Sequence, residues 1–132
     1  MNRVERALEL RRNGYNCAQS VVCAFSDAVD VEEEVLFKIA EGFGTGMGGM
    51  QHVCGAVVGA VMLNGLLNSS GKANSGSLAK TLGMSRQLTQ AFEERNGSTV
   101  CKELKGTETG KVLSSCNDCI VEAIKLVEEM LF

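Results

Sequence analysis

Apolar residues along this chain recur at intervals of three and four, and no segment alternates apolar and polar positions as a half-buried strand would. The chain also contains no proline, a residue that would interrupt a helix. The spacing predicts helices over residues 2–12, 16–25, 30–41, 54–67, 77–95 and 115–131. The sequence therefore predicts an all-α, single-domain bundle of about five or six helices over residues 1–132.

The segment 53–67 carries no charged side chain and is predicted to be the central helix of the bundle. Its positions 55, 56, 59 and 60 are all Gly or Ala, so one side of the helix has little bulk. Close approach of a neighbouring backbone would offset the cost of about 1 kcal/mol for glycine in a helix interior. The run is shorter than the roughly 20 residues that a bilayer span needs, so we expect no membrane insertion.

Polar pairs three residues apart indicate where helices begin, and apolar positions indicate which faces turn inward. The predicted capping pairs are Asn16 with Gln19, Asp30 with Glu33, and Ser115 with Asp118. The predicted inner faces include Val35, Leu36, Ile39 and Ala40 in the third helix, Leu78, Leu82, Leu88 and Phe92 in the long helix, and Ile120, Ala123, Ile124, Val127 and Leu131 in the last.

Charge and composition exclude several classes of function. The net charge is −3 and no long basic run occurs, so neither nucleic acid nor an anionic membrane is an expected partner. The segment Met1–Leu8 is charged and amphipathic and does not have the pattern of a signal peptide, which predicts a cytoplasmic protein.

Six cysteines are many for such a chain, and in a reducing compartment they indicate metal ligands or reactive thiols more than structural disulfides. Cys17, Cys54, Cys116 and Cys119 fall at predicted helix starts, and Cys101 lies in a turn or short helix. A helix terminus contributes roughly 0.3–1 kcal/mol when exposed and up to about 2 when partly buried. A thiol pKa of about 8.5 would then fall to about 7–8.

Cys116 and Cys119 form a CxxC motif whose side chains lie about one turn apart on a helix. Two sulfurs so placed can chelate a metal or form a disulfide. The βαβ context of a thioredoxin is missing, and Ile120 stands where a haem-attachment motif requires histidine. Any larger site must therefore draw ligands from distant helices.

A glycine-rich loop precedes the central helix, and Gly44, Gly46, Gly48 and Gly49 would permit a nest of backbone N–H groups for an anion or small ligand. The loop lacks the Lys-Ser/Thr ending of a P-loop and does not follow a strand, which argues against nucleotide. Close wrapping of the chain over a thiol site is the alternative role. The only histidine, His52, follows this loop.

Several segments of the chain together resemble the C_GCAxxG_C_C family of proteins described as redox-active. These segments are Asn16–Gln19, Gly42–Gly44, Cys54–Gly59, Cys101–Leu104 and the late Cys119. The resemblance covers essentially the whole chain. It implies that the four family cysteines correspond here to Cys17, Cys54, Cys101 and Cys119, and that Cys23 and Cys116 are additional.

The leading hypothesis is that Cys17, Cys54, Cys101 and Cys119 meet at one redox-active site, as a dithiol–disulfide system or as ligands of an iron–sulfur cluster. A structural zinc site of three or four cysteines, with Cys116 and His52 also among the candidate ligands, is one alternative. A non-redox module that binds a ligand in the glycine loop is another. If the protein is an enzyme, its thiols make it oxidoreductase-like. The redox partner and the oligomeric state, a homo-oligomer included, stay open.

Overall fold

The computed structural model describes all residues, 1–132, and contains seven α-helices and one wide helical turn. They are α1 (Arg3–Arg12), α2 (Cys17–Cys23), α3 (Glu33–Glu41), η1 (Gly46–Met50), α4 (Gly55–Asn68), α5 (Leu78–Asn96), α6 (Cys101–Lys105) and α7 (Cys116–Leu131). The predicted all-α fold is confirmed. The count exceeds five or six because the segment around Cys101, predicted as a turn or short helix, is a helix.

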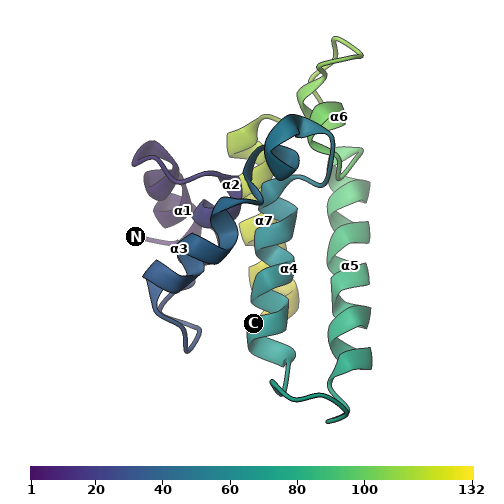
Figure 1. Ribbon diagram of the computed structural model, residues 1–132. Helices are drawn as coiled ribbons and strands as arrows, with labels where there is room; N and C mark the ends of the chain where they lie inside the picture. The colour runs from purple at the N-terminus through teal and green to yellow at the C-terminus, as the bar shows by residue number, and fades with distance from the viewer.

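Helix α4 stands in the middle of the bundle, with α2 and α3 on one side, α5 on the other and α7 behind it (Figure 1). Gly55 and Gly59 of this helix face α2 closely: a Cβ at Gly59 would lie 2.9 Å from the Cβ of Val21 and 3.0 Å from the carbonyl oxygen of Ala18. Helix α2 therefore packs against the small-residue side of the central helix. None of the helices combines the length and the apolar character that a membrane crossing requires.

Two of the three predicted caps are confirmed. Asn16 and Gln19 form a reciprocal capping box at α2, and the Ser115 hydroxyl accepts from the N–H of Asp118 at 3.1 Å. The prediction for Asp30 was wrong: α3 begins at Glu33, preceded by Glu32, and has no side-chain cap.

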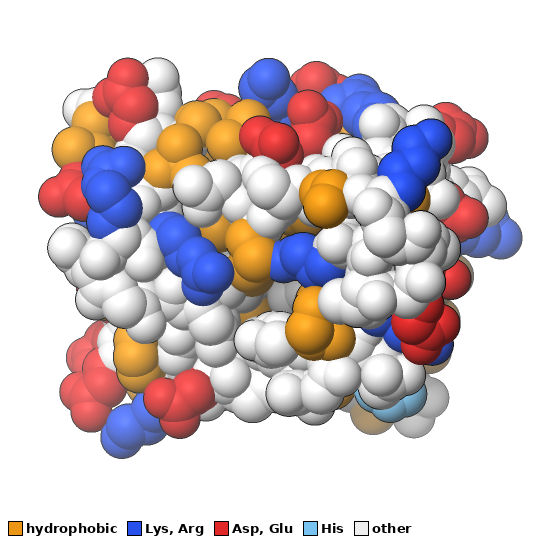
Figure 2. All heavy atoms as spheres, turned by 90° about the horizontal axis from the view of Figure 1, so that it is seen from above, with side chains coloured by type: hydrophobic (Ala, Val, Ile, Leu, Met, Phe, Trp, Pro, Cys, Tyr) orange, Lys and Arg blue, Asp and Glu red, His pale blue; other side chains and the backbone are white.

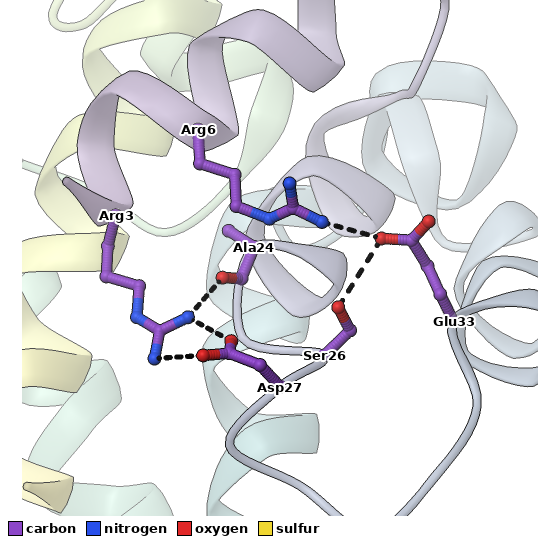
Figure 3. Close-up of polar contacts among 6 residues, drawn as sticks. All are labelled: Arg3, Arg6, Ala24, Ser26, Asp27 and Glu33. Atoms are coloured by element: carbon purple, nitrogen blue, oxygen red, sulfur yellow. Dashed lines mark hydrogen bonds and ion pairs between the residues drawn. The ribbon is translucent and has the colours of Figure 1, made fainter. Parts of the chain in front are cut away.

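The Glu33 carboxylate serves a tertiary contact instead of a cap. It pairs with Arg6 of α1 at 3.1 Å, while Arg3 donates to the carbonyl oxygen of Ala24 at 2.8 Å and pairs with Asp27 (Figure 3). These contacts hold α1 against the start of α3 and the segment that joins α2 to α3.

The predicted inner faces are partly correct. Leu88 and Phe92 are buried, but Leu78 and Leu82 are exposed, 69% and 59% respectively. Leu78 and Phe92 are 14 residues apart and lie only about 40° apart around the helix axis, so sharing a face with a buried residue does not bury Leu78. Only α4 and α7 among the helices pack substantially against α5.

The third helix shows the same division. Leu36 and Ala40 are buried, whereas Val35 and Ile39 are exposed. In α7, Leu131 is half-buried and the other four predicted positions are buried.

Candidate functional site

A backbone bridge sets two cysteines side by side at the end of the bundle where α4 and α6 begin. The N–H of Cys54 donates to the carbonyl oxygen of Thr99 at 2.7 Å, and the N–H of Cys101 donates to that of His52 at 2.9 Å. Cys54 is the residue before the first of α4, and Cys101 is the first residue of α6.

Two glycines allow other elements to close around these thiols. A Cβ at Gly55 would lie 3.3 Å from the Cβ of Cys17, and a Cβ at Gly46 would lie 2.6 Å from that of Cys101. Gly46 also has φ +56°, a left-handed conformation that glycine tolerates at little cost. Glycine at these positions lets α2 and η1 approach Cys54 and Cys101.

Four thiols and two cations line one cavity of about 180 Å³ at this end of the bundle. The thiols are those of Cys17, Cys54, Cys101 and Cys116, the cations are Arg11 and Lys105, and the remaining lining residues are Thr45, Gly46, Met50 and Gly55. Seen from above, this face has a hollow with hydrophobic side chains in its depth and Lys or Arg side chains on either side (Figure 2). No carboxylate lines the cavity.

The thiols lie next to one another as two pairs. Cys17 is the neighbour of Cys116, and Cys54 is the neighbour of Cys119, which is fully buried beside the cavity. Each sulfur of the CxxC motif therefore neighbours a thiol from another helix. The second pair is also held by Ser114, whose hydroxyl lies 3.4 Å from the Cys119 sulfur.

The two thiols of the first pair have pKa values shifted in opposite directions. The hydrogen bond from Cys17 lowers the pKa of Cys116 to about 5; burial opposes this shift, and the hydrogen bond and charge of Lys105 support it. The same contact with Cys116, followed by burial, raises the pKa of Cys17. These shifts favour ionisation of Cys116 before Cys17.

The second pair follows the same pattern. The hydrogen bond from Cys54 lowers the pKa of Cys119, while contact with Cys119 and then burial raise the pKa of Cys54. Burial raises the pKa of Cys101, against the charge of Lys105. Two neighbouring thiols, one of them with a lowered pKa, can be oxidised to a disulfide.

The family model described as "Putative redox-active protein (C_GCAxxG_C_C)" matches residues 15–130, from the start of α2 to the end of α7. The chain belongs to the C_GCAxxG_C_C family. This membership supports a redox role, and the matched region contains all six cysteines. Neither a curated protein nor a solved structure shows significant similarity to the chain.

In this family member, the residues that sequence reasoning singled out do not all lie together. Of the four family cysteines, Cys17, Cys54 and Cys101 line the cavity and Cys119 lies behind Cys54. Cys116, which the resemblance placed outside the family set, lines the cavity as well.

Cys23 and His52 lie apart from the other thiols. Cys23 is fully buried, and burial raises its pKa to about 11. His52 is exposed and does not line the cavity. No three His, Cys, Asp or Glu side chains are placed so that they could hold one metal ion.

The four loop glycines have different surroundings. A Cβ at Gly44 would meet the Asn16 side chain at 2.4 Å, and Gly46 packs against Cys101, whereas Gly48 and Gly49 have open space around them. Close wrapping thus accounts for the first two glycines.

Sequence reasoning missed Lys105 and Arg11 as parts of the site. A signal for Lys105 was present, because it follows Cys101 by four residues and therefore shares its face of α6. No comparable signal exists for Arg11, which reaches the cavity from a different helix.

Proposed function

We propose that this protein is a thiol redox protein in which the pairs Cys17–Cys116 and Cys54–Cys119 alternate between dithiol and disulfide. The observation that carries the proposal is the placement of four sulfurs as two neighbouring pairs, in each of which one thiol has a lowered pKa. Membership of a family described as redox-active supports the same class of chemistry.

Oxidation of one pair removes two electrons and the remaining thiol proton, and it forms one S–S bond. The thiolate is the form that reacts with an oxidant or a disulfide, and a thiol of low pKa is also a good leaving group in exchange. Lys105 supports the thiolate form of Cys116 through its hydrogen bond. Cys116 is the half-buried member of its pair and Cys17 is buried, so we infer that oxidants reach Cys116 first.

An iron–sulfur cluster is the second candidate, and the observation that favours it is that four cysteines line one cavity. Cys17, Cys54, Cys101 and Cys116 would hold such a cluster, which would supply electron transfer. A single zinc ion needs about four ligands at roughly 2.3 Å from one point. The absence of any three suitably placed ligands makes zinc the weaker alternative.

The test starts from protein purified without oxygen. Iron content, visible absorption and the number of free thiols are measured first, and the thiols are counted again after treatment with diamide. We expect colourless protein that loses four of its six thiols, with peptide mapping that shows Cys17–Cys116 and Cys54–Cys119. Bound iron with visible absorption would favour the cluster, and an unchanged thiol count without iron would rule out both.

A further inference from the structure

The lining of the thiol cavity is positively charged in an otherwise acidic protein. Its two cations, Arg11 and Lys105, form no ion pair with a carboxylate, while the chain carries a net charge of −3. Lys105 donates to Cys116. Arg11 makes one long hydrogen bond, 3.4 Å, to the carbonyl oxygen of Tyr15. Most of the guanidinium N–H groups of Arg11 are therefore free to bind a ligand.

Access and size restrict what can react in this cavity. Cys17, Cys54 and Cys101 are at most 7% exposed, whereas Cys116 is half-buried. A ligand that enters therefore meets the Cys116 sulfur, with the cations beside it. Since liquid water occupies about 30 Å³ per molecule, the cavity of about 180 Å³ holds a ligand of only a few non-hydrogen atoms.

We propose that the cavity binds small anions that carry a sulfane sulfur, of which thiosulfate is the simplest, and that Arg11 determines this specificity. The inference rests on the proposed dithiol function of Cys17 and Cys116. A thiolate attacks divalent sulfur, and a planar guanidinium matches the oxygens of an oxyanion. A peptide disulfide or glutathione disulfide exceeds the size of the cavity.

The first step transfers one sulfur atom. The Cys116 thiolate attacks the outer sulfur of thiosulfate and forms a Cys116 Sγ–S bond. The S–S bond of thiosulfate breaks, and its electron pair leaves on sulfite. Arg11 holds the sulfonate oxygens before the step and the sulfite afterwards. Sulfite is a weakly basic leaving group, which favours its departure.

The second step uses the thiol that neighbours Cys116. The Cys17 sulfur attacks the Cys116 Sγ and forms the Cys17–Cys116 disulfide. The transferred sulfur departs as hydrosulfide and takes the proton of the Cys17 thiol. The sulfane sulfur is thereby reduced by two electrons and the two cysteines are oxidised. An external dithiol would restore the reduced pair by exchange.

The experiment uses the reduced full chain without oxygen, with thiosulfate as the probe and hydrogen peroxide as a small neutral oxidant. Sulfite, sulfide and the Cys17–Cys116 disulfide are followed over time. Arg11→Gln is expected to slow the thiosulfate reaction by about tenfold, as the loss of a charge-assisted hydrogen bond predicts, and to leave the peroxide reaction nearly unchanged. Arg11→Lys should recover part of the rate.

Arg12→Gln is the matched control, because Arg12 is the exposed neighbour of Arg11 and does not line the cavity. It should react with thiosulfate as the unmodified protein does. Added salt gives a measurement that needs no variant, since it should slow the thiosulfate reaction and spare the peroxide reaction.

Two results would overturn the inference. If diamide forms the Cys17–Cys116 disulfide but thiosulfate releases no sulfite, the anion specificity is wrong and the dithiol function stands. If Arg11→Gln slows both oxidants equally, Arg11 acts on the thiolate and not on the anion. Failure of diamide to form the disulfide would instead remove the proposed function itself.

Discussion

The Nζ of Lys105, in the last turn of α6, donates a hydrogen bond to the Sγ of Cys116, the first residue of α7. The two residues are 11 positions apart in the sequence. Cys17 of α2 and Arg11 of α1 also lower the pKa of Cys116. Three other helices thus supply the groups that favour ionisation of this one thiol.

Replacing Lys105 by Met should raise the pKa of Cys116 from about 5, because the thiolate loses a hydrogen bond and a positive charge. A hydrogen bond to a charged group is worth roughly 1.5–3 kcal/mol, or about one to two pKa units. The pH dependence of alkylation of Cys116, read by mass spectrometry, measures this value. Lys102→Met is the control, since Lys102 does not line the cavity. An unchanged profile for Lys105→Met would show that Cys17 alone sets the pKa.

The stability of the reduced protein should depend on pH through Cys116. Its pKa falls from an ordinary 9.0 to about 5 on folding, so between these values the unfolded chain binds more protons than the folded one. The stabilisation of the folded state by the Cys116 ionisation is therefore fully present above about pH 9 and is lost as the pH falls towards 5. The raised pKa values of Cys17 and Cys54 act in the opposite sense above pH 9.

Urea unfolding under reducing conditions, at a series of pH values between 5 and 9, checks this prediction. The difference in unfolding free energy between the unmodified protein and Cys116→Ser should grow with pH, because contributions from distant groups cancel in that comparison. A difference that is flat over this range would contradict the ionised state of Cys116 in the folded protein.

Removal of one cysteine of a pair should abolish the disulfide of that pair and leave the disulfide of the other pair intact. After diamide treatment, Cys17→Ala is expected to retain Cys54–Cys119 and to lose the disulfide of Cys116. Cys23→Ala, altered at a thiol outside the cavity, should retain both disulfides. Peptide mapping and the count of free thiols are the measurements. A new disulfide between Cys116 and Cys119 in Cys17→Ala would show that the CxxC motif acts by itself.

Two glycines of α4 should respond to alanine in opposite directions. A Cβ at Gly59 would lie 2.9 Å from Val21, whereas nothing lies within 4 Å of a Cβ at Gly65. Gly59→Ala is expected to destabilise the protein by about 1–3 kcal/mol through overpacking. Gly65→Ala should stabilise it by roughly 0.5–1 kcal/mol, the helix preference of alanine. Chemical unfolding midpoints measure both, and stabilisation by Gly59→Ala would contradict the close contact of α4 with α2.

Local sequence determined most of the helices of this protein. Capping pairs such as Asn16 with Gln19 and Ser115 with Asp118 act within one turn, so they can be recognised without knowledge of the rest of the chain. The same holds for the small-residue side of α4. Predictions failed at Leu78 and Leu82 because an apolar residue marks an inner face only where another helix covers it.

Only the tertiary structure decided which thiols meet. Sequence spacing fixes where a side chain lies on its own helix, but the core packing fixes how the helices are placed relative to one another. For that reason Cys116 neighbours Cys17 and Cys119 neighbours Cys54, although each member of the CxxC motif stands closer in sequence to the other. Arg11 joins the cavity for the same reason: α1 packs against α2 and α7, a relationship that no local pattern in the chain encodes.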